Sequence, residues 1–377
     1  MKFMKKKTII ALMLSSLSFA SMADVTLYGE IKGGLEYTKV KHADNTVTRI
    51  SDWDSRIGFK GSEELGEGFK GIWQIEQYVS LDSKDEANRS WSDRISFLGF
   101  ETEVGTFRFG HLEDSVKSLK DVIDPWEGNG IRGLGHYTRT GQYLTSVRYD
   151  SPDFGGFNFN ISYAPEDNFR YDRIRYFGAS DDISAEVISR DLNRVTGSYK
   201  DTISAGLGYE NNGFFGKYAY KNVKVKLPEA DKDWNGQVHS ILFGYDANNI
   251  YAVLGYQYTK DYDKDVLNYD YGILSKNVKV SEEALTISYD VGNVTPRLSY
   301  VHGEKKYGDL NNLKQKYDQV VLGADYNFSK RTSALISAGW LKNKRDKNSY
   351  SYNPATGEYS NDGLEAYTIG LGVRHKF

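Results

Sequence analysis

The chain has 377 residues, of which 39% are hydrophobic and 14% aromatic, and it carries a formal net charge of −3 and no cysteine. The lack of cysteine excludes a disulfide framework and a thiolate metal site, and the slightly acidic balance argues against a nucleic-acid-binding protein, which would show a basic face. The 37 glycines and 29 tyrosines favour a protein built from β-strands over a disordered one.

The first 23 residues have the three parts of a secretory signal peptide. Four lysines open it, an apolar stretch follows at 8–20, and the residues at 21–23 form a small-residue cleavage site. The alternative is a membrane anchor, but the apolar run is too short to span a bilayer comfortably. We expect cleavage after Ala23, which leaves 24–377 as one mature domain with a formal net charge of −7.

The mature chain opens with a long alternation of apolar and polar side chains at 24–37. Val25, Leu27, Ile31 and Leu35 fall on one face, and polar residues such as Glu30 fall on the other. Alternation over about a dozen residues exceeds the usual strand of a soluble sheet and fits a tilted membrane-spanning strand. No later segment has the ~18 uninterrupted apolar residues of a membrane helix.

The same pattern recurs along the chain and predicts sixteen strands in eight hairpins. Short turns alternate with long polar loops, which is the layout of bacterial outer-membrane barrels, and an even count leaves both termini at the same end. The expected strands lie at 24–37, 56–64, 69–81, 94–101, 106–111, 143–151, 157–164, 195–210, 214–226, 238–247, 250–260, 282–291, 295–305, 316–328, 332–344 and 366–377.

The last of these segments reads AYTIGLGVRHKF and ends on Phe377 in register with its apolar face. An aromatic residue at this place suits the girdle of a membrane barrel. An open sheet in lipid would leave edge amides and carbonyls unpaired, at several kcal/mol each. We therefore expect an all-β antiparallel barrel that closes by pairing the first strand, from Asp24, with the last, which ends at Phe377.

One connection, 112–141, is far longer than usual for a compact domain. It carries the acidic residues Asp114, Asp121, Asp124 and Glu127, and Glu113 lies near its start. A long connection of this kind is normally functional or disordered. We interpret it as a loop that folds into the barrel and narrows a water-filled pore; the alternative is a solvated surface loop.

Three blocks of the sequence resemble the neisserial-type general porins of Gram-negative bacteria: DVTLYGEIKGG at the mature start, VRYDSPDFGGFNFNISYA, and GLGVRHKF at the C-terminus. The resemblance extends over essentially the whole chain. It implies a sixteen-stranded trimeric barrel whose third loop folds inward, and passive diffusion of ions and small hydrophilic solutes. A departure is His111, where such porins often carry arginine.

If the apolar faces meet lipid, the polar faces line the lumen, because a lysine or arginine on the lipid side would cost about 2–4 kcal/mol at midplane. Opposed rows of charge in a pore discriminate solutes by charge. On this basis we expect a basic wall of Arg56, Lys60, Arg94, Arg108 and Arg148. The acidic side is expected to be Glu113, Asp114, Asp121, Asp124 and Glu127. The basic wall favours anions, although the net charge favours cations.

Two other functions are alternatives to a general porin. A barrel hydrolase would need a nucleophile, a base and an orienting residue together, and the sequence offers no such set and no GxSxG motif. A substrate-specific sugar channel would need aromatic residues along the lumen, yet most aromatics fall on the lipid register. The histidines lack HxxxH spacing, so we expect no enzyme activity, cofactor or metal. The expected partners are a homotrimer, outer-membrane lipid and lipopolysaccharide, small ions and solutes, and no nucleic acid.

Overall fold

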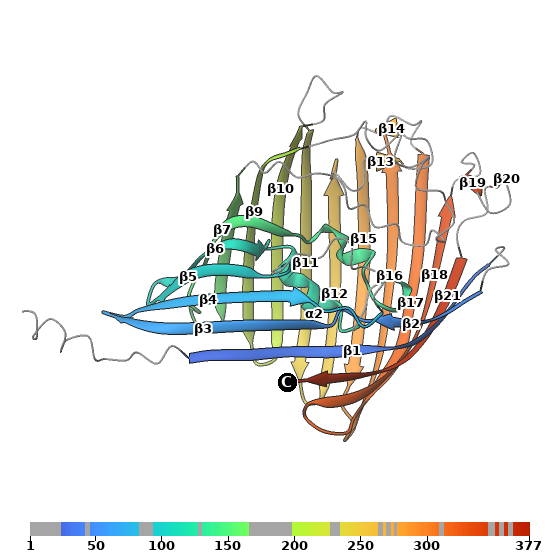
Figure 1. The fold of residues 1–377 in the computed structure, drawn as a ribbon. Helices are drawn as coiled ribbons and strands as arrows, with labels where there is room; N and C mark the ends of the chain where they lie inside the picture. The colour runs from blue at the N-terminus through green and yellow to red at the C-terminus, as the bar shows by residue number, and fades with distance from the viewer. Residues whose placement is uncertain are drawn as a thin grey trace, which may run out of the picture.

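The computed structural model describes residues 24–41, 46–82, 93–126, 130–165, 198–226, 234–262, 267–268, 273–274, 277–308, 313–345, 351–353, 358–360 and 365–377. Residues 1–23, which contain the predicted signal peptide and its cleavage site after Ala23, lie outside this part. Nearly all described elements are β-strands (Figure 1). No helix of the described residues is long and apolar enough to cross a membrane.

One large antiparallel sheet contains most of the strands, and two small hairpins stand apart from it. The strands of the sheet are β1 (Asp24–Val40), β2 (Thr46–Asp52), β3 (Arg56–Gly66), β4 (Phe69–Tyr78), β5 (Ser96–Thr102), β6 (Gly105–Glu113), β7 (Tyr143–Asp150), β8 (Phe157–Ala164), β9 (Ser198–Asn211), β10 (Phe214–Lys226), β11 (Trp234–Ala247), β12 (Ile250–Lys260), β15 (Val278–Tyr289), β16 (Val294–Tyr307), β17 (Leu313–Asn327), β18 (Thr332–Arg345) and β21 (Glu365–Lys376). The hairpins are β13 (Leu267–Asn268) with β14 (Ile273–Leu274), and β19 (Ser351–Asn353) with β20 (Glu358–Ser360).

The sheet closes on itself between its first and last strands. β1 pairs with β21 over a register that runs from Glu30 opposite Lys376 to Val40 opposite Ala366. Beyond this register the backbones of Gly29 and Phe377 exchange two hydrogen bonds of 3.1 Å. The predicted closure is confirmed. It removes the unpaired sheet edges that would be costly in lipid.

β2 and β3 are two parts of one barrel strand. β2 pairs with the C-terminal half of β1 and β3 with its N-terminal half, where Asp24 faces Ser62. The strand is interrupted at Trp53, Asp54 and Ser55, and Asp54 has a left-handed φ of 69°. Counted together they give the sixteen strands predicted. The predicted strand begins at 56 and leaves out 46–52, because the interruption breaks the two-residue period.

Two of the short turns have the left-handed backbone that their sequences favour. Asn212 and Gly213 have φ values of 50° and 81°, and Asn248 and Asn249 have 54° and 64°. A two-residue hairpin turn with positive φ at both positions matches the twist of the flanking strands. The hairpins predicted here, β9–β10 and β11–β12, are confirmed.

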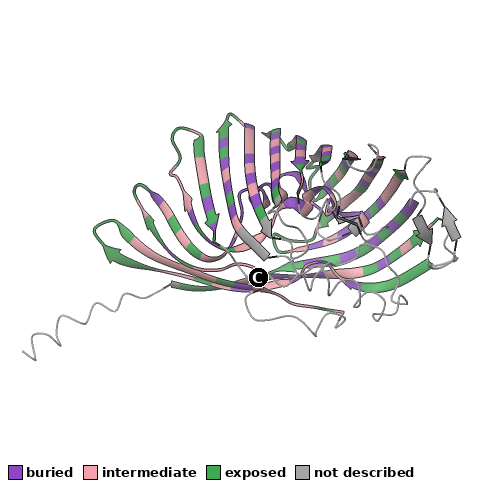
Figure 2. Cartoon of the chain, turned by 90° about the horizontal axis from the view of Figure 1, so that it is seen from above, coloured by how far each residue is buried: buried purple, intermediate pink, exposed green. Residues whose placement is uncertain are grey.

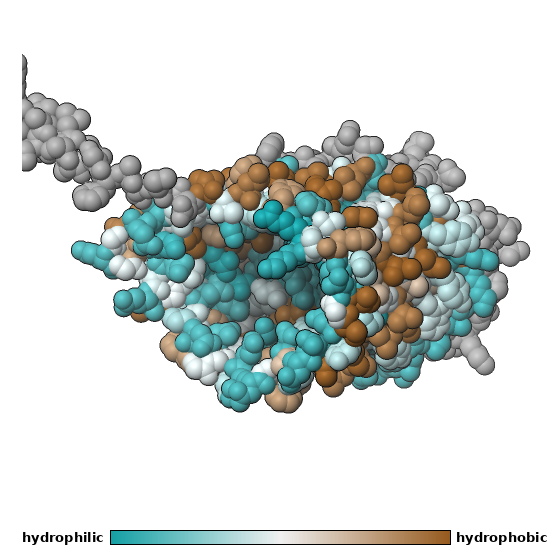
Figure 3. Space-filling model, turned by 90° about the horizontal axis from the view of Figure 1, so that it is seen from below, coloured by the Kyte–Doolittle hydropathy of each residue, from teal (hydrophilic) through white to brown (hydrophobic). Residues whose placement is uncertain are grey.

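Exposed and buried residues alternate along the strands, as the banding in Figure 2 shows. Many of the exposed residues are large and hydrophobic. On β21 the exposed residues are Tyr367, Ile369, Leu371 and Val373, and the residues between them are buried. Seen from below, the hollow of the barrel is lined with hydrophilic residues while hydrophobic ones gather outside (Figure 3). The outer face is therefore suited to lipid and the inner face to water.

The barrel wall is uneven in height. β5, β6, β7 and β8 have 7, 9, 8 and 8 residues, whereas β9 to β12 and β15 to β18 have 11 to 15. At ~3.3 Å per residue and a tilt of about 40°, eight residues rise about 20 Å and fourteen about 35 Å. The apolar band of an outer-membrane barrel is about 25 Å tall. We call β5–β8 the short wall, and β9–β12 with β15–β18 the tall wall.

Candidate functional site

Residues 114–140, which connect β6 to β7, form four short helical turns: η2 (Lys117–Leu119), α2 (Lys120–Ile123), η3 (Gly130–Arg132) and η4 (Tyr137–Thr140). Such short helices leave most of their carbonyls without internal partners. Side chains of β12, β15, β16 and β17 supply several of these partners. Gln257 donates to the Tyr137 carbonyl (3.0 Å), Thr286 to Ile123 (2.8 Å), Arg297 to Pro125 (3.1 Å) and Gln319 to Gly133 (2.7 Å).

We call residues 114–140 the crossing segment. Its two ends, which we call its root, lie next to β6 and β7, while its hydrogen-bond partners lie on the tall wall (Figure 1). Its apolar side chains pack on the same wall. They are Val116, Leu119, Ile123, Trp126, Leu134 and Tyr137, which share a buried cluster with side chains of β10, β11, β12, β15, β16 and β17. Each such burial stabilises by roughly 1.5–3 kcal/mol. Packing therefore contributes to the position of the segment together with its hydrogen bonds.

The root of the crossing segment is fixed by Asp114, which the sequence analysis placed among the constriction acids. Its side chain and that of Lys221 on β10 are both fully buried and form an ion pair of 2.9 Å. The carboxylate also accepts hydrogen bonds from the backbone amides of Lys117 (2.7 Å) and Gln142 (3.0 Å). Lys221 donates further to the Thr140 carbonyl. Asp114 thus joins both ends of the segment to β10.

Arg132 fixes the middle of the crossing segment to the first strand of the barrel. Its guanidinium is 3.2 Å from the carboxylate of Glu36 on β1 and lies 4.0 Å above the ring of Trp53. It also donates to Ser337 on β18 at 3.4 Å. Arg132 is only 4% exposed. Its contacts link the segment to β1, to Trp53 between β2 and β3, and to β18.

Asp124 holds a turn within the crossing segment. Its two carboxylate oxygens accept hydrogen bonds from the backbone amides of Trp126 (3.2 Å) and Leu134 (3.1 Å). Burial disfavours the ionised form and raises the pKa of Asp124 to about 7, against the lowering effect of Lys120 and of the two amides. Asp124 is therefore buried and holds the segment together internally. Asp121 is exposed, and no feature of the sequence separates the two residues.

The raised pKa of Asp124 predicts a pH dependence of stability. The folded state retains this proton above the ordinary pKa of 3.8, so the stability contribution of Asp124 falls as pH rises from about 4 to about 7. We expect the thermal midpoint of the parent protein in detergent to fall more between pH 5 and pH 8 than that of an Asp124→Asn variant. Equal pH slopes for the two proteins would contradict this assignment.

Two of the predicted basic residues meet acids on the wall formed by β1, β3 and β4. Arg56 is 2.8 Å from Glu30 and 3.8 Å from Glu76, and Arg94 is 2.5 Å from Glu76. The guanidinium of Arg94 also lies 4.4 Å above the ring of Tyr78. The charge of this wall is therefore partly balanced, which the sequence analysis did not anticipate.

Arg108 and Arg148 face each other on β6 and β7 and share the carboxylate of Asp150, at 2.5 and 2.8 Å. Arg148 also donates to the backbone carbonyl of Glu113 and to the hydroxyl of Ser118, both at 2.9 Å. Arg148 is thus buried and connects the wall to the root of the crossing segment, while Arg108 keeps a quarter of its side chain exposed.

The remaining predicted charges are spread over different surroundings. Lys60 is exposed, with its ammonium 5.4 Å from the ring of Tyr28. Glu113 is half-buried at the end of β6, Asp121 is exposed on α2, and Glu127 lies outside the described residues. The ring of His111 is 5.8 Å from that of Tyr143.

Several charged residues of this region are absent from the predicted basic wall and acidic side. Glu30, Glu76 and Asp150 lie on the polar face of correctly predicted strands. Their place in the alternation of polar and apolar residues therefore already indicated that they face the lumen. Lys117 and Lys120 lie on the crossing segment, and burial lowers the pKa of Lys117 to about 8, with a further contribution from Lys120. Among the described residues no three histidine or acidic side chains are grouped so that they could hold a metal ion.

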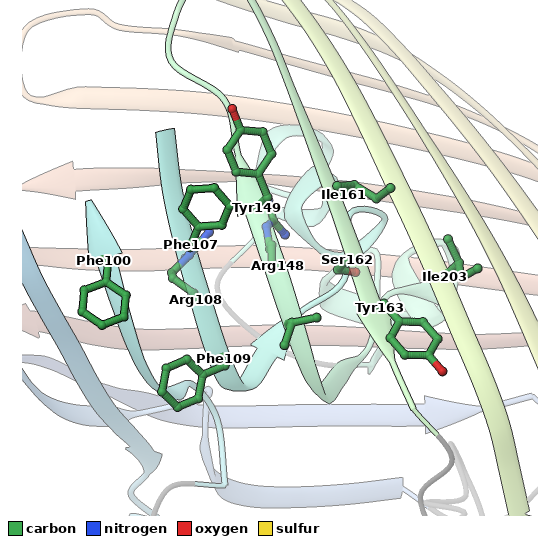
Figure 4. Close-up of a pocket in the computed structure, with 11 residues that line it drawn as sticks. Phe100, Phe107, Arg108, Phe109, Arg148, Tyr149, Ile161, Ser162, Tyr163 and Ile203 are labelled. Atoms are coloured by element: carbon green, nitrogen blue, oxygen red, sulfur yellow. The ribbon is translucent and has the colours of Figure 1, made fainter. Parts of the chain in front are cut away.

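The outer face of the short wall carries an apolar groove of about 600 Å³. Rings and aliphatic side chains from β5 to β9 line it (Figure 4): Phe100, Phe107, Phe109, Val147, Tyr149, Ile161, Tyr163 and Ile203. The backbones of Arg108 and Arg148 run between these residues, so the groove lies behind the charged inner face of the same strands. This is a separate surface from the lumen.

A closed sixteen-stranded barrel, apolar outside and charged inside, defines a membrane-spanning β-barrel channel. The Gram-negative porin profile matches residues 23–377, and this chain belongs to that family. The chain is 38% identical over 400 residues to major outer membrane protein P.IB of Neisseria sicca, and 39% identical over 399 residues to that of Neisseria gonorrhoeae. Each match covers 99% of this chain and 100% of the relative.

Solved structures show the same fold. An anion-selective porin from Comamonas acidovorans superposes with a TM-score of 0.68 at 21% identity, over 94% of this chain and 100% of that one. OmpF of Salmonella typhi, in complex with daunomycin, superposes with a TM-score of 0.65 at 18% identity, over 95% and 99%. The protein is an outer-membrane general diffusion porin, as predicted, and its relatives are channels rather than enzymes.

Proposed function

We propose that the crossing segment forms the constriction of this porin and that the charged wall opposite it selects among solutes. The observation that carries the proposal is the attachment of the segment to two separate strands of the barrel, at its start and at its middle. Asp114 and Lys221 hold its root on β10 at 2.9 Å, and Arg132 reaches Glu36 on β1 at 3.2 Å. Its apolar residues pack on the tall wall, so water and solutes pass along the charged side.

The charges proposed to face this passage differ in part from those that hold the segment. Arg56, Arg94, Arg108 and Lys60 line the wall, and Arg148 joins it to the segment. On the opposite side we retain Glu113, Asp121 and Glu127. Asp114 and Asp124, which are buried and fully engaged, position the segment instead of meeting solutes.

An anion preference follows from the proposed arrangement, because the exposed wall charges are mainly basic. The Debye length is about 8 Å at physiological salt, so charges in the passage act more strongly on an ion than the net charge of the protein. The test is the reversal potential of the purified protein in a planar lipid bilayer under a potassium chloride gradient. We expect the sign that marks chloride as the more permeant ion; the opposite sign would contradict the proposed wall.

We further propose that the protein is a homotrimer whose short walls face one another. A wall that rises only about 20 Å does not fill an apolar band of about 25 Å, so lipid alone would leave a mismatch there. The groove over β5–β9 offers an apolar surface for a second copy at the same place (Figure 4). The tall wall, with its longer strands, is left to meet lipid.

A matched pair of substitutions tests this orientation. Val147 on the short wall and Leu322 on the tall wall are both outward-facing and similarly exposed, at 55% and 58%. We expect Val147→Arg to yield monomers in mild detergent, because a charge would enter the protomer contact, while Leu322→Arg retains trimers. The measurement is the mass of the purified assembly by light scattering. Trimers in both variants, or monomers only in Leu322→Arg, would reverse the assignment.

A further inference from the structure

Two glycines on the inner face of the barrel lie directly beneath the crossing segment. Gly339 is on β18 and Gly370 is on β21, and these two strands pair with each other (Figure 1). A methyl group added to Gly339 would overlap the backbone carbonyl of Ile131, and one added to Gly370 would lie 2.7 Å from Cδ of Arg132. Both contacts are with η3, in the middle of the crossing segment. We call Gly339 and Gly370 the glycine seat.

The backbone conformation does not require glycine at either position of the glycine seat. Neither residue has a left-handed φ, in contrast to turn glycines such as Gly213. Glycine weakens the interior of a strand, because it loses more conformational freedom on folding than other residues and has no side chain to pack. A glycine in an ordinary strand conformation therefore indicates that another part of the chain approaches closely. Here that part is the crossing segment.

The residues on either side of Gly370 bind the side chain that passes over it. Across the sheet, Gly370 is opposite Ser337 on β18 and Glu36 on β1. Arg132 spans this row, because its guanidinium lies 3.2 Å from the carboxylate of Glu36 and donates to the hydroxyl of Ser337 at 3.4 Å. A side chain at position 370 would lift Arg132 away from both partners.

The backbone carbonyl that lies on Gly339 is held there by a hydrogen bond from the same wall. Gln319 on β17 donates to the carbonyl of Ile131 at 3.1 Å and to that of Gly133 at 2.7 Å. The backbone of η3 thus rests on the backbone of β18 with no side chain between them. With a methyl group at position 339, an ordinary separation of about 3.5 Å would require the Ile131 carbonyl to move by about 1 Å or more.

We propose that Gly339 and Gly370 are positioning residues that set the width of the passage. This inference rests on the proposed role of the crossing segment as the constriction. The strands of a closed barrel are fixed relative to one another, so any displacement of η3 from β18 and β21 moves it into the space through which solutes pass. The glycine seat holds the segment as close to its wall as backbone contact allows, and so keeps the passage at its widest.

The test compares Gly339→Ala and Gly370→Ala with the parent in single-channel recordings of the purified mature protein. Gly208→Ala is the matched control, because Gly208 is also buried on the inner face but its nearest neighbour is the flexible side chain of Asn158 on β8. Lys221→Met, which removes the cation that holds the root of the segment on β10, is the reference for a released segment.

We expect both glycine-seat variants to conduct in smaller but steady steps, since the segment is pushed into the passage while its other attachments remain. Permeation of a neutral trisaccharide into proteoliposomes should fall by at least about twofold, and chloride current by less, because pore diameter limits large solutes most. A variant that only folded less well would form fewer channels of parent step size, and such a result would contradict the proposal.

A second measurement tests whether Gly370 acts through the side chain above it. In an Arg132→Ala background the overlapping atoms are absent, so Gly370→Ala should cause no further change in step size, a coupling expected of residues in direct contact. Equal reductions by Gly370→Ala in the two backgrounds would contradict the proposed contact.

The reference variant separates failure of this inference from failure of the proposed constriction. Parent-like or larger steps in Gly339→Ala and Gly370→Ala, with larger steps in Lys221→Met, would overturn the glycine seat and leave the constriction in place. Parent-like steps in all three variants would overturn the constriction itself, and the inference with it. A reduction in Gly208→Ala equal to that in Gly339→Ala would assign the effect to any methyl group added to the inner face and would overturn the inference too.

Discussion

A Lys221→Met variant is expected to conduct in larger and less steady steps than the parent porin. The substitution leaves the Asp114 carboxylate fully buried without its cation, and removing one partner of a buried ion pair costs about 3–5 kcal/mol. The root of the crossing segment depends on that carboxylate, which also holds the amides of Lys117 and Gln142. Loss of this tie should release the segment from β10 and widen the passage.

Single-channel recordings measure the effect, and limited proteolysis of the folded barrel reports whether the crossing segment becomes accessible. Lys217→Met on the same strand is the matched control, since Lys217 is half-buried and has no acidic partner among the described residues. The double variant Asp114→Asn with Lys221→Met removes both charges and should recover most of the parent behaviour. Parent-like steps and protection in Lys221→Met would show that the ion pair does not hold the constriction.

The double substitution Arg56→Gln with Arg94→Gln is expected to shift the channel strongly toward cations. It removes two positive charges and leaves Glu30 and Glu76 without these guanidinium partners. In a water-filled passage each lost charge changes the energy of an ion about 8 Å away by about 0.5 kcal/mol, with opposite sign for anions and cations. Two such changes alter the ratio of permeabilities by about thirtyfold at low salt, and by about fourfold when a Debye length of about 8 Å screens them.

The reversal potential under a salt gradient measures this ratio, and a change of its sign is the expected result. Lys330→Gln with Arg331→Gln removes the same charge at the exposed turn between β17 and β18 and should leave the potential unchanged, because the turn lies outside the passage. A shift of equal size in this control would mean that the net charge of the protein, and not the wall at Arg56, sets selectivity.

The sequence was sufficient for the barrel but only partly for the site. Strand positions, closure and the short turns follow from local rules, since the two-residue period and the Asn-Gly and Asn-Asn turns are legible in consecutive residues. The acids of the crossing segment show the limit. Asp114, Asp121 and Asp124 look alike in sequence, yet two are buried and one is exposed.

The sequence by itself determined that this chain forms a closed β-barrel with an apolar exterior and a polar interior, because an alternation of period two in lipid admits no other arrangement that pairs every backbone group. Only the tertiary structure decided which charges remain available to solutes. The partner of Asp114 is Lys221, 107 residues away, and the partner of Arg132 is Glu36, 96 residues away. These side chains become buried and paired only when the crossing segment packs against strands far away in the sequence. Local sequence patterns therefore cannot predict which charges are paired.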